Sequence, residues 1–239
     1  MEINTIHLGD AYELIKQVPD KSVDLIVTDP PYEYDSLSGA GIAGLKDSFK
    51  HLKENGIDKG FDLALLDEFV RVLKKINLYV WVSKKQFRKI LNYMVDKYDC
   101  SWDLIIWKKS NALPLCNNQY LHDCEYCLYF RKGIKVNTSY ETAHTVYVTS
   151  INQSDKKQYS HPTIKPEEII ENLIKNSCGG GLVFDPFVGS GTTCAVAKRL
   201  GYDYLGFEIN PKWHQVAVDR LNGITVNQRK MGVEQLKLF

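Results

Sequence analysis

Residues 183–193 read Val-Phe-Asp-Pro-Phe-Val-Gly-Ser-Gly-Thr-Thr, an apolar run followed by a glycine-rich turn and the start of a helix. Glycines let a backbone pass close to a ligand, and a helix N-terminus offers free N–H groups. Seventeen residues after Gly191, Glu208 ends the next apolar run, residues 204–207. An acidic residue at this place can bind the ribose hydroxyls of a nucleoside. The order predicts a nucleoside-binding site, and the alternative is a well-capped helix after a core strand.

Short apolar runs alternate with amphipathic stretches along the chain. We predict strands at 23–28, 78–82, 101–107, 124–130, 182–184 and 203–207, and helices at about 10–17, 62–75, 84–97, 166–177, 191–200 and 211–222. This alternation indicates an α/β fold in which helices cover both faces of a mixed, mainly parallel sheet. We expect residues 1–239 to form a single domain.

The composition is ordinary for a soluble globular protein, with 44% apolar and 25% charged residues. No apolar run approaches the ~20 residues of a membrane span, and the first residues lack the features of a signal peptide. We therefore expect a cytoplasmic protein without a membrane partner, whose six cysteines are free thiols. Cys124 and Cys127 are expected on opposite faces of a strand, which argues against a metal site there.

The net charge of +1 does not by itself indicate a nucleic-acid-binding protein. Residues 68–135, however, contain thirteen Lys or Arg against six Asp or Glu. A local basic face could neutralise phosphates while acidic segments elsewhere balance the total. Solvated helix faces would give the same count, and both interpretations stay open.

A second motif, Asp29-Pro30-Pro31-Tyr32, follows the apolar run 23–28 directly. It suits the methylation of an exocyclic amine on a flat heterocycle, whose lone pair is delocalised into the ring. Asp29 can accept one N–H, the Pro30 carbonyl can accept the other, and Tyr32 can stack on the ring. The prolines fix φ and remove backbone donors, so the turn aims its carbonyls. The alternative is a plain strand-ending turn rich in Asp and Pro.

A third motif, His161-Pro162-Thr163-Ile164-Lys165-Pro166, opens the predicted helix at 166–177. Thr163 and Lys165 near a helix N-terminus are suited to bind an amino-acid carboxylate. The alternative is a capping segment with an incidental lysine.

Along the chain, the three motifs follow one another at residues 29–32, 161–166 and 185–193. With the motifs in this order, the chain resembles the β-class amino methyltransferases of DNA, which use S-adenosylmethionine. In that family the DPPY motif lies near the N-terminus and the cofactor segment near the C-terminus, a circularly permuted order. The resemblance covers roughly residues 5–32, 60–130 and 160–222. It implies the Rossmann-like sheet of S-adenosylmethionine-dependent methyltransferases, and methyl transfer to N6 of an adenine flipped out of duplex DNA.

The resemblance also implies roles for individual residues. Asp29, Pro30, Pro31 and Tyr32 would form the catalytic motif that holds the target base. Glu208 would bind the ribose of the cofactor, and Asp10 would border its adenine. The remaining residues expected at the cofactor are His161, Thr163, Lys165, Asp185, Phe187, Gly189, Ser190, Gly191 and Thr192. Double-stranded DNA is the expected partner, and a homodimer and a cognate restriction endonuclease are further candidates.

Two segments interrupt the strand–helix pattern. Residues 33–60, rich in glycine and lysine, are expected to form a mobile loop after the catalytic motif. Residues 131–160, which contain a further predicted strand at 145–149, are expected to be a small inserted target-recognition segment. Relatives often have glycine after the tyrosine, whereas this chain has Glu33, which leaves the course of the following loop undetermined.

Several other functions compete with this one. Relatives that methylate cytosine N4 tend to have Ser in place of Asp29, so Asp29 favours adenine. Methyltransferases of RNA or of protein glutamine commonly have Asn there and place the cofactor motif first. A regulatory module that only binds nucleotides would not need an intact DPPY motif. An NAD-dependent oxidoreductase is disfavoured because Cys194 stands where the third glycine of its fingerprint belongs.

If residues 33–60 form a loop that nucleic acid orders, added DNA should protect them from limited proteolysis. Mass spectrometry of the fragments locates the cleavage sites. Cleavage within 33–60 at the same rate with and without DNA would contradict this hypothesis.

Overall fold

The computed structural model describes residues 1–33, 60–112, 120–151, 159 and 164–225, and all its strands belong to one eight-stranded sheet. The strands are β1 (Thr5–Leu8), β2 (Leu25–Thr28), β3 (Asn77–Val82), β4 (Ser101–Lys109), β5 (Cys124–Arg131), β6 (Val146–Thr149), β7 (Leu182–Asp185) and β8 (Asp203–Glu208). Their order across the sheet is β1-β8-β7-β2-β3-β5-β4-β6. Only β5 runs antiparallel to its neighbours, so the predicted mixed, mainly parallel sheet is confirmed.

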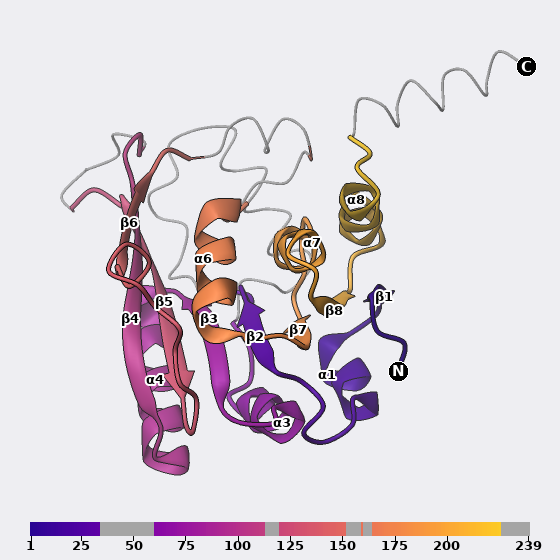
Figure 1. The fold of residues 1–239 in the computed structure, drawn as a ribbon, viewed down its shortest axis with the longest axis horizontal. Coiled ribbons are helices and arrows are strands. Elements are labelled where there is room, and N and C mark those ends of the chain that lie inside the picture. The colour runs from indigo at the N-terminus through magenta and orange to yellow at the C-terminus, as the bar shows by residue number, and fades with distance from the viewer. Residues whose placement is uncertain (34–59, 113–119, 152–158, 160–163, 226–239) are drawn as a thin grey trace, which may run out of the picture.

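Helices cover both faces of this sheet (Figure 1). They are α1 (Ala11–Leu14), α3 (Leu65–Val72), α4 (Lys84–Tyr98), α6 (Glu167–Ser177), α7 (Thr192–Arg199) and α8 (Pro211–Leu221). In β2, Ile26 packs with α1, α3 and α4, whereas Leu25 and Val27 pack with α6 and α7. Because β2, β3 and β7 are buried on both faces, they read as continuous apolar runs rather than as alternating ones.

Local sequence signals explain where the helices begin. Ser83 and Gln86 form a reciprocal capping box at the start of α4. Asn210 caps α8 by accepting hydrogen bonds from two backbone N–H groups, and Pro211 occupies the first helical position. Glu167 and Glu168 lie in the first turn of α6, where the helix dipole favours acidic groups.

The structure adds one strand that the sequence did not reveal. β1 has four residues, of which only Ile6 is buried, so its apolar pattern is too short to indicate a strand. The predicted helix at 10–17 is also divided, into α1 and a 3₁₀ turn at Ile15–Gln17. Residues 34–59, nearly all of the predicted mobile loop, lie outside the described part of the chain.

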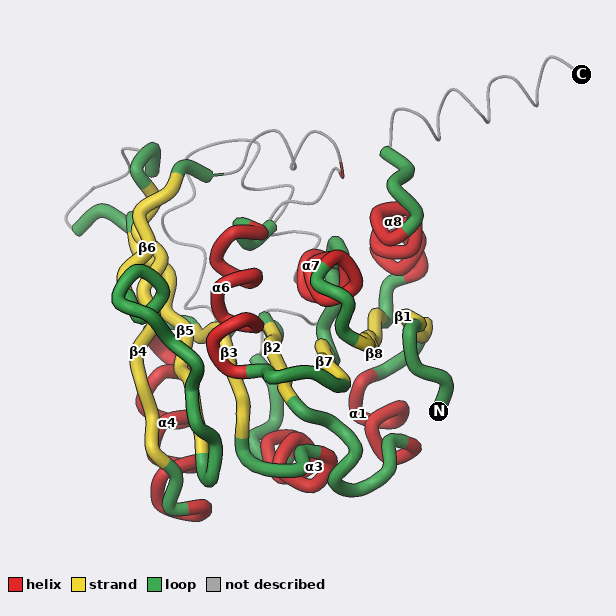
Figure 2. Tube along the Cα trace, in the orientation of Figure 1, coloured by secondary structure: helices red, strands yellow, loops and turns green. Residues whose placement is uncertain are grey.

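The predicted target-recognition segment is described over residues 131–151 and at Tyr159. It contributes β6, which lies at the outer edge of the sheet beside β4 (Figure 2). Asn172 and Asn176 of α6 both donate hydrogen bonds to the carbonyl of Thr142, so this segment is tied to the helix that follows the third motif.

The carboxyl ends of the parallel strands meet at one edge of the sheet. The chain moves outward in one direction from β2 to β3 and in the other from β7 to β8, so the topological switch point lies between β2 and β7. Ligands of open α/β sheets bind at such a point. Asp29 directly follows β2, Asp185 ends β7 and Glu208 ends β8, which places all three predicted site residues at this edge.

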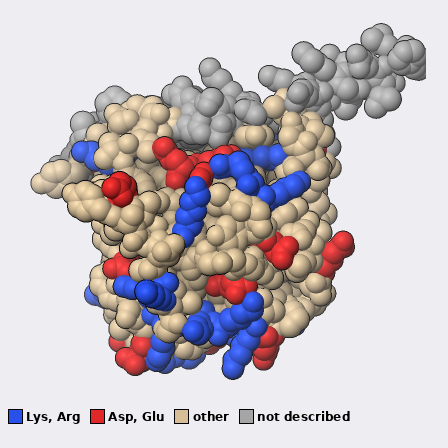
Figure 3. Space-filling view, viewed as in Figure 1, with Lys and Arg blue, Asp and Glu red and all other residues tan. Residues whose placement is uncertain are grey.

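Charges of both signs lie side by side on the face seen in Figure 3. More than half of the basic residues in the segment 68–135 form ion pairs with carboxylates. These are Arg71, Lys74, Lys85, Lys89, Lys97, Lys109, Arg131 and Lys132. This pairing favours the interpretation of solvated helix faces over that of a free basic surface. None of the helices in the described part of the chain is long and apolar enough to cross a bilayer.

Gly206 lies where β8 packs closely against its neighbours, and Gly206→Ala should destabilise the protein. A Cβ atom there would lie 2.4 Å from Val188 Cγ2 and 2.9 Å from Cys194 Sγ. Overpacking of this kind costs roughly 1–3 kcal/mol. Gly179→Ala is the control, since within the described chain only its immediate neighbours lie within 4 Å of its Cβ position. Urea unfolding followed by circular dichroism measures both, and equal stabilities would contradict this packing.

Candidate active site

Asp29 has one carboxylate oxygen paired and the other open. Its Oδ2 accepts a hydrogen bond from Lys165 Nζ at 2.5 Å, although the two residues are 136 positions apart. Its Oδ1 is buried and has no hydrogen-bond partner within the described part of the chain. Burying an acceptor without a partner costs free energy, so this oxygen is suited to receive a donor from a ligand.

Lys165 is the buried centre of a chain of alternating charges. Its Nζ lies 3.0 Å from Glu125 Oε2, and Glu125 Oε1 lies 2.6 Å from Lys109 Nζ. Burial opposes ionisation of Glu125, but Lys165 and Lys109 outweigh it and lower the pKa of this carboxyl to about 2. Burial also acts to lower the pKa of Lys165, yet Asp29 and Glu125 raise it above the ordinary value. Both Glu125 and Lys165 are therefore charged at neutral pH.

Two aromatic rings border the ammonium of Lys165. Its Nζ lies 4.9 Å from the centre of the Trp81 ring and 5.6 Å from that of Tyr32. The Tyr32 hydroxyl lies 3.5 Å from the same nitrogen. The structure thus brings together Asp29, Tyr32 and Lys165, predicted from two separate motifs.

The N-terminus of α4 holds the catalytic turn from the other side. Gln86 Nε2 donates to the carbonyl of Pro31 at 2.9 Å, and Ser83 Oγ donates to the carbonyl of Glu33 at 3.3 Å. The Glu33 carboxylate forms ion pairs with Lys85 and Lys89, which lower its pKa. The residue that departs from the family pattern is therefore a second anchor of the turn.

Asp185 connects the catalytic strand to the glycine-rich turn. Its Oδ1 accepts hydrogen bonds from Thr28 Oγ1 at 2.9 Å and from the Phe187 N–H at 3.1 Å. The side chain is buried, and burial raises its pKa from 3.8 to about 7. The two halves of the site, β2 and β7, are thus joined by a buried hydrogen bond.

The glycine-rich turn is closed by Glu208. Its Oε2 accepts from the Gly189 N–H at 2.9 Å, and its Oε1 accepts from the Asn210 N–H at 2.8 Å. Burial raises the pKa of this carboxyl. Gly189 and Gly191 have φ angles of 54° and 85°, a region that favours glycine, and Gly191 caps α7. The structure therefore contains the arrangement that the sequence predicts here: a strand, a glycine-rich turn, a helix and an acidic residue.

Two exposed apolar side chains, Leu8 and Ile209, lie beside Glu208. Leu8 pairs with Glu208 in the sheet, and Ile209 follows Glu208 in the chain. Both side chains are unusually exposed for their type, at 50% and 60%. Asp10 follows β1 at the same edge and caps α1 through the Tyr12 N–H.

The structure adds site residues that sequence reasoning missed. Ser83 and Gln86 could have been predicted as a helix start, since Ser-x-x-Gln before an apolar pattern is the capping-box signature. Glu125 could have been predicted to have a charged partner, because it is a single acid within an apolar strand and such acids are rarely buried unless paired. No comparable indication in the sequence pointed to Lys109, Leu8 or Ile209. His161 and Thr163 lie outside the described residues, and their predicted roles stay predictions.

Comparison with known proteins points to one family. The N6/N4 methyltransferase model, described as DNA methylase, matches residues 23–219. The type II methyltransferase M.HinfI of Haemophilus influenzae is 30% identical, with 99% of this chain and 73% of the relative aligned. The type II methyltransferase M2.DpnII of Streptococcus pneumoniae is 29% identical, over 89% of this chain and 87% of the relative.

Solved structures share the architecture. The crystal structure of the M1.HpyAVI–SAM complex aligns with a TM-score of 0.68 at 25% identity, over 91% of this chain and 98% of that one. PvuII DNA methyltransferase, described as cytosine-N4-specific, aligns with a TM-score of 0.69 over 90% of this chain and 85% of that one. At 21% identity, the second likeness concerns the fold alone.

The raised pKa of Asp185 predicts a pH-dependent stability that Asp185→Asn removes. Between 3.8 and about 7 the unfolded chain is ionised here while the native state keeps its proton. Native stability should therefore fall as the pH rises through this interval and level off above it. Thermal melting of both proteins without ligand, from about pH 5 to about pH 8, isolates this group. A parallel pH dependence in the two proteins would contradict the assignment.

Proposed function

Because the chain belongs to the N6/N4 family of S-adenosylmethionine-dependent DNA methyltransferases, we propose that it methylates N6 of an adenine flipped out of duplex DNA. The main support for this proposal is the environment of Asp29 at the carboxyl end of β2. One of its oxygens is fixed by Lys165, and the other is buried without a partner in the described chain.

The residues on the β7–β8 side fit S-adenosylmethionine. The turn at Gly189–Gly191 has no side chains on its two glycines, so a ligand can approach its backbone. Glu208 retains lone pairs beyond its two backbone hydrogen bonds and can accept the ribose hydroxyls. Leu8 and Ile209 supply exposed apolar surface for a flat heterocycle. When bound, the cofactor supplies a methyl group on a positively charged sulfur.

The residues on the β2–β3 side fit an amine. An adenine inside a duplex cannot reach this edge, so it must leave the stack at a cost of a few kcal/mol. Tyr32 can repay part of this cost by stacking, which is worth about 1–3 kcal/mol per base. Asp29 Oδ1 can accept one N–H of the exocyclic amine and stabilise the positive charge that develops on nitrogen. The proton need not leave before the amine attacks, because the amine becomes acidic only once it is methylated.

Lys165 belongs to the base-binding half in this geometry. Its ammonium contacts Asp29 and Glu125 and lies near the hydroxyl of Tyr32. These contacts support a role in orienting the catalytic carboxylate. The role near the cofactor's carboxylate, which the family resemblance implies for Lys165, stays part of the same proposal.

The proposal extends to recognition and partners. Segment 131–160 is short, and its exposed Tyr140, Val146 and Val148 support contact with DNA or with a second copy of the chain. We propose that it reads a short site, with a homodimer to extend it. A cognate restriction endonuclease is the partner suggested by the type II methyltransferases among the relatives.

Single-molecule sequencing of DNA from cells that express this chain tests the reaction, because it reports the modified base and its sequence together. We expect N6-methyladenine at one short motif. If only cytosine were modified, the chain would be a cytosine-N4 methyltransferase instead. Unmodified DNA would favour a regulatory module that binds nucleotides without catalysis.

Asp29→Ala should abolish methyl transfer while leaving the affinity for S-adenosylmethionine within a few-fold, since Asp29 acts on the base. Calorimetry measures the affinity, and incorporation of labelled methyl groups into DNA measures transfer. Asp20→Ala is the matched control, because Asp20 is exposed and pairs only with Arg71 in the described chain. An equal loss of cofactor binding and transfer in Asp29→Ala would contradict this division of roles.

A further inference from the structure

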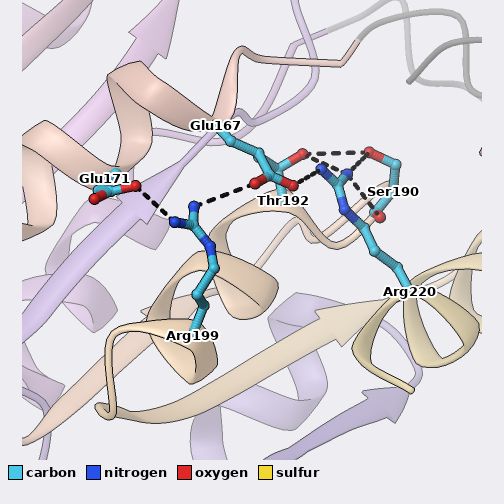
Figure 4. A network of polar contacts seen from close by, with 6 residues as sticks. All are labelled: Glu167, Glu171, Ser190, Thr192, Arg199 and Arg220. Atoms are coloured by element: carbon cyan, nitrogen blue, oxygen red, sulfur yellow. Dashed lines mark hydrogen bonds and ion pairs between the residues drawn. The ribbon is translucent and has the colours of Figure 1, made fainter. Parts of the chain in front are cut away.

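Arg220 is a buried cation in the last turn of α8, and no sequence motif pointed to it. Its side chain is 2% exposed. Figure 4 shows that it reaches from α8 to Ser190 and Thr192 in the glycine-rich turn and to Glu167 at the start of α6. A buried charge is costly unless it is well paired, so the arrangement of these partners is informative.

Arg220 binds the turn through three acceptors. Its Nη1 lies 2.9 Å from Thr192 Oγ1 and 3.4 Å from both the carbonyl oxygen and the hydroxyl of Ser190. Its Nη2 donates to Glu167 Oε1 at 2.7 Å. The ring of Tyr159 covers the guanidinium, with its centre 4.4 Å from Cζ. The planar fork of arginine can serve the turn and the carboxylate at the same time.

The turn needs an external support because of its two glycines. Gly189 and Gly191 flank Ser190, and both adopt positive φ angles. Glycine loses more conformational freedom on ordering than any other residue, so contacts from outside the turn help to hold it in one shape. Arg220 bonds the backbone carbonyl and the hydroxyl of Ser190, which is the residue between the two glycines.

The same face of α8 also packs against the turn. A Cβ atom on Gly191 would lie 3.0 Å from Ala217 Cβ, and Ala217 is three residues before Arg220. Residues three apart lie on one face of a helix. α8 therefore contacts the turn by close packing at Ala217 and by hydrogen bonds at Arg220.

We propose that Arg220 is a positioning residue that holds the turn Gly189–Thr192 in the shape that binds S-adenosylmethionine. This inference rests on the proposed function, in which that turn contacts the cofactor. Arg220 acts through Ser190 and Thr192, with Glu167 as its fixed counter-charge.

Arg199 provides a matched control within the same network (Figure 4). It pairs with the same Glu167 and with Glu171, so its ion pairs join α7 to α6. Its side chain is 49% exposed, and its ion pairs leave the glycine-rich turn untouched. A general effect of lost ion pairs on stability should appear in both arginine variants, whereas an effect on the turn should appear only at Arg220.

The test compares Arg220→Lys with Arg199→Lys. Lysine keeps the charge and can pair with Glu167, but its single ammonium cannot also serve the turn with the geometry of the fork. We expect Arg220→Lys to weaken calorimetric binding of S-adenosylmethionine on the order of tenfold, the loss of about one charge-assisted hydrogen bond. The KM for the cofactor should rise while kcat at saturation stays within a few-fold. Arg199→Lys should bind like the unaltered protein.

Hydrogen exchange without cofactor supplies an independent readout. The amides of Gly189–Thr192 should exchange faster in Arg220→Lys, and those of β3 should be unchanged. Glu167→Gln keeps Arg220 and removes its counter-charge, so it tests the proposal if Arg220→Lys fails to fold, with a smaller loss of affinity expected. The inference would be overturned if Arg220→Lys and Glu167→Gln both bound S-adenosylmethionine, and exchanged the amides of the turn, like the unaltered protein. A failure of the unaltered protein to bind S-adenosylmethionine would instead overturn the proposed function.

Discussion

The ion pair between Lys165 and Asp29 is the interaction on which the site depends. It joins the end of β2 to the segment that precedes α6, and Glu125 adds the beginning of β5 to the same cluster. A buried ammonium is stable only where its carboxylates are in place, because an uncompensated buried charge is strongly destabilising. Since β5 runs antiparallel, its first residues reach the edge where the parallel strands end. The one reversed strand of the central sheet therefore supplies the acid that Lys165 requires.

On the side of the edge proposed to bind the cofactor, carboxylates again hold the chain, here through hydrogen bonds to the backbone. Glu208 and Asp185 both accept backbone N–H groups from the glycine-rich turn and its approach. Carboxylates at strand ends can in this way fix a turn whose two glycines have no side chains to pack. Thr28 donates to Asp185 and directly precedes Asp29, so one residue of β2 separates the two halves. The sides proposed to bind the base and the cofactor are adjacent, yet each has its own set of hydrogen-bond and ion-pair partners.

Local signals explain what could be predicted from the sequence. The turn at 189–191 and the catalytic motif at 29–32 were readable because their chemistry lies within a few residues. Glu125 and Arg220 were not assigned roles, since their meaning depends on partners that are distant in sequence. Arg220 reaches Thr192 and Glu167 across 28 and 53 positions. Glu33 looked like a departure until Lys85 and Lys89 of α4 were placed beside it. Strand β1 was missed because a strand of four residues with only Ile6 buried gives no readable periodicity.

The charges of the central cluster also bear on how Asp29 can act. Lys109, Glu125, Lys165 and Asp29 alternate in sign, so the cluster is neutral as a whole. A neutral base can therefore enter beside a cluster that has no net charge. In the proposed reaction, positive charge develops on an amine beside the open oxygen of Asp29, with Lys165 on the other oxygen. Coulomb energy falls with distance and is larger where water is excluded, so the near carboxylate outweighs the farther ammonium. The cluster can hold Asp29 in one orientation and still leave its charge available to the amine.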